Sequence, residues 1–167
     1  YGNGFSRLLW GAVDNAEKRN RATVFGYYVN DPERFGVVEF DKMGKALSIE
    51  EKPKQPKSNY AVTGLYFYPK GVSKRAAEVK PSWRGELEIT TLNEMYLKDD
   101  LLDVKLLGRG FAWLDTGTME ALAEATDFVR VMQTRTGIEI SAPEEIGFRK
   151  GWLTHDELMA AATAYGK

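Results

Sequence analysis

Apolar residues near the start of the chain recur every three or four positions, with polar residues between them. That spacing is typical of a helix with one buried face, and it predicts a helix over 5–16. The next apolar segment, 22–29, is rich in β-branched and aromatic residues, and Asn30-Asp31-Pro32 interrupts regular structure after it. We therefore expect a strand to follow the first helix.

Three more segments have the composition of strands, and they span 36–40, 46–51 and 60–68. Residues 41–44 (DKMG) separate the first two by the length of a hairpin turn, and residues 53–58 (PKQPKS) form a loop before the third. Short turns of this kind join antiparallel neighbours. Two further short strands are expected over 103–107 and 111–114, divided by Gly108-Arg109-Gly110.

The helical pattern returns in the second half of the chain. We expect a short helix over 71–79, a second helix that begins near Gly85, and a long helix over 118–135 that stops at Gly137. Two capping boxes, Ser141 with Glu144 and Thr154 with Glu157, predict the starts of two final helices. This order of elements indicates an α/β fold with one mixed sheet, flanking helices and a helical C-terminal tail.

Composition narrows the class of partner. The 167 residues carry 23 Lys and Arg against 24 Asp and Glu, so the near-zero net charge argues against nucleic acid as a partner. The chain has no cysteine, which excludes disulfides and thiolate metal sites. Its apolar runs are too short for a membrane helix, so we expect a soluble, cytoplasmic protein. Because it begins with Tyr1 and not with methionine, we expect a piece of a longer protein.

Charged residues gather where the strand 46–51 ends. Glu50 and Glu51 alternate along this strand and face opposite sides, so they cannot act together as a carboxylate pair. A twist before Pro53 would let Glu51 and Lys52 border one cleft. The alternative is a solvated strand edge of mixed charge.

Two other segments carry candidate chemistry, each with an ordinary alternative. Arg84 precedes a predicted helix start and suits a phosphate, or else it pairs with Glu86 or Glu88. Asp115 follows a predicted strand and suits Mg²⁺, or else the segment 115–118 simply caps a helix. The sole histidine, His155, lies in a capping box and is expected at the surface. The aromatic residues within the strands are expected to pack in the core and not to stack on bases.

Four ordered segments together resemble one family, glucose-1-phosphate thymidylyltransferase. They are Val29 to Phe40, Glu50 to Tyr68, Arg84 to Thr90 and Gly108 to Gly117, and the similarity continues into Pro143-Glu144-Glu145-Ile146 and Arg149-Lys150-Gly151. The resemblance implies the sugar-binding half of a Rossmann-like nucleotide-diphospho-sugar transferase fold. It divides the chain into a sugar-phosphate-binding part, 1–135, and a regulatory or assembly tail, 136–167.

The resemblance also implies a reaction and a site. Family members transfer a thymidylyl group from dTTP to α-D-glucose 1-phosphate, with Mg²⁺ as the metal, to give dTDP-glucose and pyrophosphate. By motif, Lys52 and Arg84 match the catalytic residues that bind the sugar phosphate, and Asp115 matches a Mg²⁺ ligand. The sugar itself is matched to Gly36, Glu51, Val62, Tyr66 and Trp113.

A second, regulatory nucleotide site at a subunit contact of a homotetramer is also implied. The matching residues are Tyr1, Gly2, Gly108, Arg109, Ser141, Glu145 and Arg149. The family's glycine-rich GGxGTRL loop, its KQLLP segment and a second metal-binding aspartate are absent from this chain. The chain by itself is therefore expected to be inactive. Two alternatives stay open: a non-catalytic sugar-phosphate-binding or regulatory module, and a sister enzyme that uses another base.

Overall fold

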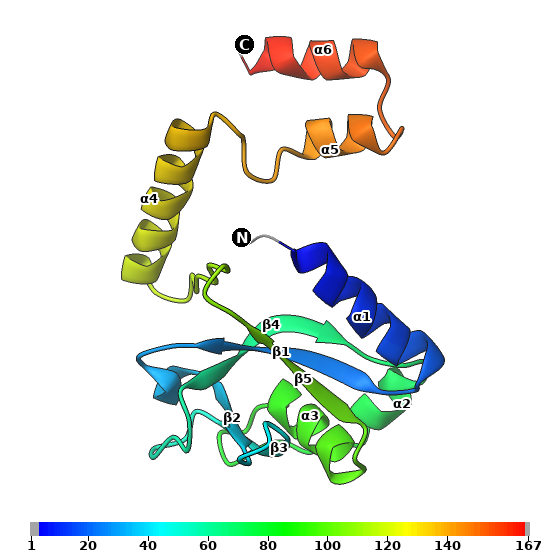
Figure 1. Ribbon diagram of the computed structural model, residues 1–167, viewed down its shortest axis with the longest axis vertical. Helices are drawn as coiled ribbons and strands as arrows, with labels where there is room; N and C mark the ends of the chain where they lie inside the picture. Colours follow the sequence, from blue (N-terminus) through cyan, green and yellow to red (C-terminus); the bar gives the residue numbers. More distant parts are fainter. Residues whose placement is uncertain (1–3, 166–167) are drawn as a thin grey trace. The chain divides into compact units, whose positions relative to one another are not determined.

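The computed structural model describes residues 4–165 and divides into two compact units, the first ending at Trp113 and the second beginning at Leu114 (Figure 1). The predicted functional division between residues 135 and 136 is a different boundary and stays a prediction. No helix within the described residues is both long and apolar enough to span a bilayer.

A five-stranded mixed sheet forms the centre of the first unit (Figure 1). In chain order the strands are β1 (Ala22–Tyr28), β2 (Gly36–Phe40), β3 (Ala46–Glu51), β4 (Tyr60–Phe67) and β5 (Leu102–Leu107). Their order across the sheet is β3-β2-β4-β1-β5, and only β1 and β5 run parallel. The predicted mixed α/β sheet is thus confirmed, including the antiparallel pairs that short loops favour.

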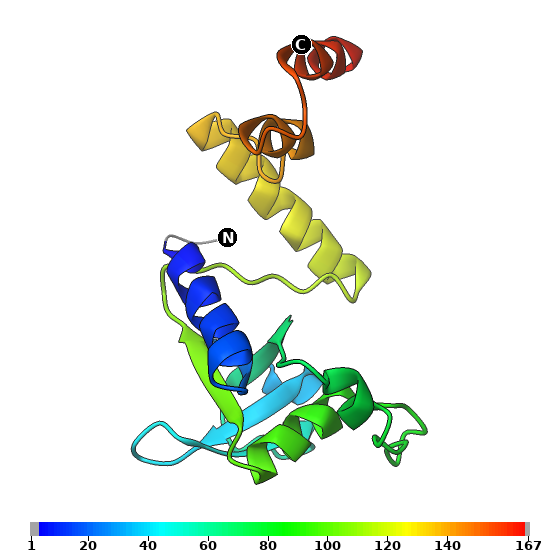
Figure 2. The ribbon, with the colours of Figure 1, turned by 90° about the vertical axis from the view of Figure 1, so that its right-hand side faces the viewer.

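Helices cover both faces of this sheet (Figure 2). Helix α1 (Phe5–Lys18) packs with Phe25, Leu65 and Phe67 on one face. Helix α3 (Ile89–Lys98) packs on the other face, where Val62 and Tyr66 belong to the same apolar cluster as Leu92 and Tyr96. In β4, Val62 and Tyr66 belong to the α3 face and Leu65 and Phe67 to the α1 face, and the register with β1 is irregular between Val62 and Tyr66.

Strand β4 is paired unevenly. One edge pairs with β1 along most of its length, whereas the other edge pairs with β2 only where Ala61 faces Val37. Within the described residues, β2 and β4 therefore diverge after that point. Gly64 is exposed beyond this point, whereas Val62 is buried in the core.

A polar network joins α1 to two strands. The Asn15 side chain is buried, and its Nδ2 donates to Thr23 Oγ1 (3.1 Å) and to Asp103 Oδ2 (2.6 Å). Arg21 Nε donates to the other oxygen of Asp103 at 2.9 Å. The network connects the end of α1 to β1 and to the start of β5.

Replacing Asn15 by alanine is expected to lower the free energy of unfolding by about 2 kcal/mol, because a buried hydroxyl and a carboxylate lose their shared donor. Urea unfolding followed by circular dichroism measures the change. Asp14→Ala is the matched control, since Asp14 is exposed on the same helix and, among residues 4–165, pairs only with Lys18 at the surface. Equal unfolding midpoints for the two variants would contradict the role assigned to Asn15.

The helix expected near Gly85 begins instead at Ile89, so that prediction is wrong by one turn. Gly85 has a left-handed backbone (φ +77°), and Glu88 is extended, so neither residue continues a helix. The segment is held as a loop because the Ser82 backbone donates to the Glu86 carbonyl at 2.8 Å. The shorter helix α2 spans Val72–Ala76 and lies within the predicted range, and a 3-10 turn covers Pro32–Arg34.

The strand expected over 111–114 is absent from the described residues, where Phe111 forms only an isolated bridge. The Phe111 carbonyl accepts a hydrogen bond from the Tyr27 hydroxyl at 3.0 Å. The Tyr27 side chain thus occupies the Phe111 carbonyl, which a neighbouring strand would otherwise use as a hydrogen-bond acceptor.

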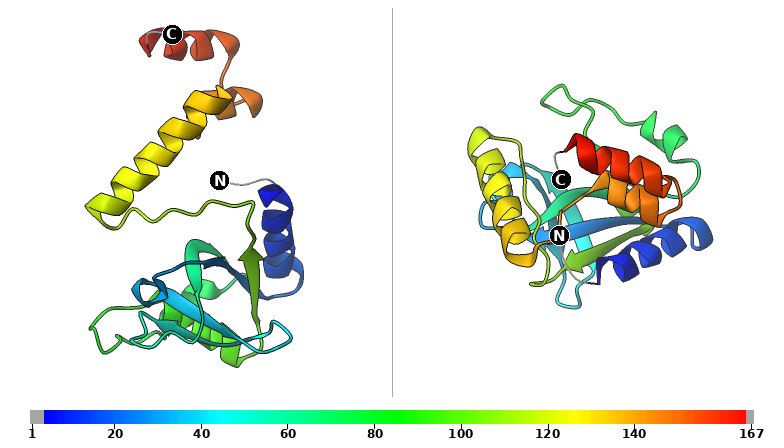
Figure 3. Two further views of the ribbon diagram at one scale, coloured as in Figure 1. Left: turned by 60° about the vertical axis from the view of Figure 1, so that its left-hand side comes forward. Right: turned by 90° about the horizontal axis from the view of Figure 1, so that it is seen from above.

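The second unit contains three helices in its described part, α4 (Met119–Thr136), α5 (Pro143–Arg149) and α6 (His155–Ala164) (Figure 3). Thr118 caps α4 by accepting from the Ala121 backbone at 3.1 Å, and left-handed Gly137 ends it as expected. The Thr154 capping box of α6 is confirmed. The box at Ser141 is wrong: Ser141 has φ +55°, and the cap of α5 is Ala142, which makes no side-chain cap bond.

Candidate substrate-binding site

Glu51 ends strand β3 and points away from its neighbour Glu50. Glu50 forms an ion pair with Lys57 at 2.7 Å, whereas Glu51 Oε2 accepts a hydrogen bond from the Thr90 hydroxyl at the start of α3. The expected separation of these two carboxylates is thus confirmed. Glu51 faces the part of the sheet where β2, β4 and α3 meet.

Gly36 lies directly opposite Glu51 in the β2–β3 ladder. A Cβ atom at this position would lie 3.1 Å from Thr90 Oγ1, 3.3 Å from Glu51 Oε2 and 3.9 Å from the Val62 Cβ. Only glycine therefore fits without displacing these groups. Three of the sequence-predicted residues, Gly36, Glu51 and Val62, are brought together here around Thr90.

Thr90 is a residue that the sequence analysis did not single out as part of the site. Its hydroxyl is buried against Glu51, and it stands in the first turn of α3. Thr90 is the last residue of the motif Arg84 to Thr90, but the arginine is the residue in that motif that attracts attention. Without the true start of α3, nothing in the sequence placed Thr90 beside a strand.

Arg84 sits among carboxylates in the loop before α3. Its guanidinium lies 3.0 Å from Glu86, 3.2 Å from Glu88 and 3.9 Å from Glu51. The alternative expectation of surface pairing with Glu86 or Glu88 is therefore met. The contact with Glu51 also places Arg84 beside the Gly36 cluster, and its side chain is 23% exposed. Guanidinium has five N–H donors, so an incoming anion can exchange with one carboxylate while others stay bound.

Lys52 follows Glu51 with an uncommon left-handed backbone (φ +44°). This bend ends β3 and breaks the alternation, which is how consecutive residues come to border one region. The Lys52 backbone donates to the Phe35 carbonyl at 3.0 Å. Its ammonium is exposed and has no acidic partner within residues 4–165.

Trp113 reaches the same region through Phe35. The two rings meet edge to face with centroids 5.2 Å apart, and Phe35 directly precedes Gly36. Gly36, Lys52 and Trp113 are thus gathered around one aromatic residue. A planar apolar side chain beside polar groups is an arrangement that suits the faces and hydroxyls of a sugar.

Tyr66 comes from β4 on the α3 face. Burial raises the pKa of Tyr66, and the nearby charge of Glu51 raises that pKa further. Its ring is stacked on Tyr68, with centroids 6.2 Å apart and planes at 6°. Gly64 lies between Val62 and Tyr66 along β4, where the register with β1 is irregular, and a Cβ there would meet nothing within 4 Å. The space at Gly64, between these two predicted wall residues in the sequence, is therefore open.

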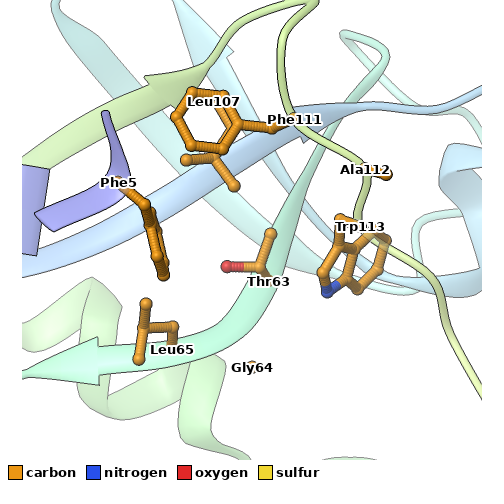
Figure 4. Close-up of a pocket in the computed structure, with 8 residues that line it drawn as sticks. All are labelled: Phe5, Thr63, Gly64, Leu65, Leu107, Phe111, Ala112 and Trp113. Atoms are coloured by element: carbon orange, nitrogen blue, oxygen red, sulfur yellow. The ribbon is translucent and has the colours of Figure 1, made fainter. Parts of the chain in front are cut away.

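A hollow of about 270 Å³ lies on the α1 side of β4 and shares Gly64 and Trp113 with the candidate site (Figure 4). It is lined mainly by apolar side chains, those of Phe5, Leu65, Leu107, Phe111 and Trp113, with Thr63 and Gly64 beside them. The Thr63 hydroxyl is buried and has no hydrogen-bond partner in the described part of the chain. The hollow has no charged lining residue, so it does not suit a phosphorylated ligand.

Residues matched to the regulatory site lie in both units. Gly108 and Arg109 line a hollow of about 620 Å³ with Tyr27, Tyr28 and Tyr60, and Tyr28 is exposed there, contrary to the expectation of core packing. In the second unit, Arg149 pairs with Glu145 at 2.5 Å, and Ser141 is exposed. Tyr1 and Gly2 lie outside the described residues.

Asp115 is partly buried in the second unit, three residues before the Thr118 cap. A Cβ at Gly117 would lie 3.1 Å from its Oδ2, so glycine there keeps room beside the carboxylate. No cluster of three or more metal-ligating side chains occurs in the described residues. Mg²⁺ is commonly held by one or two carboxylates together with substrate phosphates, so Asp115 fits the metal as one ligand.

The described residues thus gather Gly36, Glu51, Val62 and Thr90 in one place, with Arg84 in contact with Glu51. Residues 1–131 match the nucleotidyl transferase family model. The chain belongs to the nucleotidyl transferase family. Enzymes of this family generally use a divalent metal and act on sugar 1-phosphates and nucleoside triphosphates.

Curated relatives show which members of the family the chain is similar to. The chain is 55% identical to a glucose-1-phosphate thymidylyltransferase of Neisseria gonorrhoeae over 100% of this chain and 59% of that protein. It is 52% identical to the Mycolicibacterium smegmatis enzyme of the same name, over 83% of this chain and 48% of the relative. The chain thus spans about half the length of the curated relatives it matches.

Solved structures agree with these matches. A crystal structure of a putative glucose-1-phosphate thymidylyltransferase from Bacillus anthracis, in complex with sucrose, is 41% identical with a TM-score of 0.62. It covers 75% of this chain and 48% of that one. A UDP-glucose pyrophosphorylase complexed with UDP-glucose shares the fold at 22% identity, with a TM-score of 0.58 over 66% of this chain and 44% of the other.

Proposed function

We propose that this chain is the sugar-phosphate-binding part of a glucose-1-phosphate thymidylyltransferase. The whole enzyme forms dTDP-glucose and pyrophosphate from dTTP and α-D-glucose 1-phosphate. The observation that carries the proposal is the cluster of Gly36, Glu51 and Thr90 beside Lys52 and Arg84. The similarity to a thymidylyltransferase over the full chain supports the same conclusion.

Each residue has a role that follows from its chemistry. Glu51 accepts hydrogen bonds from sugar hydroxyls, and the backbone at Gly36 and Val62 contributes further polar contacts. Tyr66 and Trp113 form the walls beside the sugar ring. Lys52 and Arg84 bind the phosphate, the first as a flexible point charge and the second through its planar fork of donors.

The chemical step needs positioning and charge neutralisation more than covalent help. An oxygen of the sugar phosphate attacks the α-phosphorus of dTTP in line, and pyrophosphate leaves. Lys52 and Arg84 hold the attacking phosphate and offset the repulsion between two anions. Bound Mg²⁺ supplies additional charge neutralisation at the nucleotide phosphates, and Asp115 is its proposed ligand in this chain.

The remaining residues support a proposal about assembly. The regulatory nucleotide site that the family resemblance implies stays a proposal, as does a cytoplasmic homotetramer whose subunits meet through the tail, 136–167. Exposed apolar side chains on that tail, among them Ile138, Ile146 and Trp152, are the kind that a subunit contact covers.

The proposed function is tested at two levels. The full-length enzyme that contains this sequence is expected to release pyrophosphate from dTTP only when glucose 1-phosphate is present, and to prefer dTTP over UTP, CTP and ATP. The 167-residue chain alone is expected to form no dTDP-glucose, because it lacks the glycine-rich phosphate loop. Efficient turnover by the isolated chain, or none by the full-length enzyme, would overturn the proposal.

Gly64 offers a steric test of where the sugar lies. Gly64→Leu is expected to raise the KM for glucose 1-phosphate at least about tenfold, because the new side chain fills the open space at Gly64, beside the predicted wall residue Trp113. Gly64→Ala is expected to have a smaller effect in the same direction. Steady-state kinetics of the full-length enzyme measure both.

The matched control is Gly110→Leu. Gly110 is also exposed, and a Cβ atom at this position would meet nothing within 4 Å, but it lies in the turn after β5. A Gly64→Leu enzyme with the same KM as Gly110→Leu would show that the sugar does not occupy this space.

A further inference from the structure

A buried hydrogen bond connects α3 to β4 close to the proposed sugar pocket. The hydroxyl of Tyr68, the residue directly after β4, donates to Asn93 Oδ1 at 2.6 Å. The Asn93 side chain is fully buried (0% exposed). Its Nδ2 has no hydrogen-bond partner within residues 4–165, so the Tyr68 bond is the contact that orients this amide.

Each of the two hydrogen-bond partners lies close in the sequence to a residue of the candidate site. Asn93 follows Thr90 by three positions on α3, so the two lie on the same side of that helix. Tyr68 follows Tyr66 by two positions, and their rings are parallel at 6.2 Å. The Tyr68–Asn93 bond therefore fixes α3 against β4 at the level where Thr90 and Tyr66 both approach Glu51.

Tyr68 is also supported from its other side. Its ring lies 5.4 Å from that of Tyr96, and the Arg75 guanidinium stands 4.4 Å above the Tyr96 ring. Burial raises the pKa of Tyr68 well above its usual value, so the hydroxyl stays protonated and available as a donor at neutral pH. The tyrosine rings form a column that ends at the pocket wall.

We propose that Tyr68 and Asn93 are positioning residues for the sugar phosphate. Their hydrogen bond holds Tyr66 and Thr90 at the spacing from Glu51 that the sugar requires. Neither residue touches the substrate in this arrangement. The inference rests on the proposed function, since it assigns a purpose to the pocket walls named there.

The test removes the bond by deleting one oxygen atom. In the full-length enzyme, Tyr68→Phe is expected to raise the KM for glucose 1-phosphate by about five- to tenfold, the value of one hydrogen bond. The kcat and the KM for dTTP are expected to stay within about twofold, because wall contacts are equal in the ground and transition states. A residue that only supported the fold would lower thermal stability without this selective change in KM.

Tyr96→Phe is the matched control. It removes the hydroxyl of the next ring in the column, which makes no hydrogen bond within the described residues, and it is expected to leave every kinetic parameter unchanged. Asn93→Leu removes the acceptor with little change in volume and is expected to reproduce the effect of Tyr68→Phe. The double variant is expected to show no further rise in KM, because both changes remove the same bond.

The outcomes separate this inference from the proposed function. A wild-type enzyme that makes no dTDP-glucose overturns the proposed function, and the inference with it. An active enzyme whose Tyr68→Phe variant keeps the wild-type KM for glucose 1-phosphate overturns the inference alone. Additive effects in the double variant, or an equal effect of Tyr96→Phe, do the same.

Discussion

Lys52→Ala in the full-length enzyme is expected to lower kcat/KM for glucose 1-phosphate by about 10²-fold or more. The Lys52 ammonium is exposed, and no acidic side chain within residues 4–165 neutralises it. A phosphate can therefore bind it without first displacing a protein partner. Part of the decrease in kcat/KM is expected in kcat, because the ammonium offsets the repulsion between the two reacting anions.

Lys54→Ala is the control for Lys52→Ala. Lys54 is also exposed and stands two residues further along, beyond the left-handed turn and Pro53. The two variants remove the same charge from the protein as a whole, so any general effect of net charge on substrate attraction is shared. Kinetics of Lys52→Ala that match those of Lys54→Ala would remove Lys52 from the site.

Strand positions were predictable because they depend on local pattern. The bounds of β2 and β3 agree with the sequence prediction, and a short turn between β-rich segments leaves few other ways to pair them. The long helix α4 was equally predictable, because Thr118 caps its start and the left-handed Gly137 caps its end. In each case neighbouring residues alone determine the element.

The wrong predictions share a different cause. Gly85 was taken as a helix start, but contacts between Ser82, Glu86 and Glu88 hold that segment as a loop. Ser141 had the spacing of a capping box, yet its own left-handed backbone places it outside the helix. Residues 111–114 had strand composition without a strand partner in the described structure. Composition does not reveal which of several hydrogen-bond partners a segment selects.

The residues of the candidate site also divide into those that local sequence indicates and those that depend on tertiary contacts. Glu51 and Arg84 stood out in the sequence because charged residues at element ends are conspicuous. Thr90, Tyr68 and Asn93 did not, because their significance depends on contacts between α3 and the sheet. The convergence of Gly36 with Val62 depends on the pairing of β2 with β3 and on the way β4 diverges. The family resemblance singled out Gly36 and Val62 without giving the reason for their positions.

Arg84 differs from Lys52 because carboxylates of the protein already form ion pairs with Arg84. Glu86, Glu88 and Glu51 all lie within 4 Å of its guanidinium, and Glu88 is only 11% exposed. A bound phosphate has to exchange with at least one of these carboxylates. Glu86 is the most exposed of the three, at 59%, and water can solvate it after the exchange. Glu88 is also held by Ser82 at 3.0 Å, so it stays in place.

Arg84→Ala is accordingly expected to have two effects. It lowers kcat/KM for glucose 1-phosphate by about 10²-fold or more, and it also lowers the melting temperature, because the largely buried Glu88 loses its cation. Arg84→Lys keeps the charge without the planar fork and is expected to fall between wild type and alanine in kcat/KM. Steady-state kinetics and thermal unfolding are measured on the same preparations.

Glu86→Gln distinguishes the two effects of Arg84. If phosphate competes with Glu86 for the guanidinium, removing that charge is expected to lower the KM for glucose 1-phosphate while the melting temperature changes little, since a solvent-exposed ion pair contributes little to stability. A higher KM in Glu86→Gln would mean that Glu86 orients Arg84 for the substrate and does not compete with it. Unchanged kinetics in Arg84→Ala, with only the melting temperature lowered, would assign Arg84 to the structure of the loop and leave Lys52 as the phosphate-binding cation of this chain.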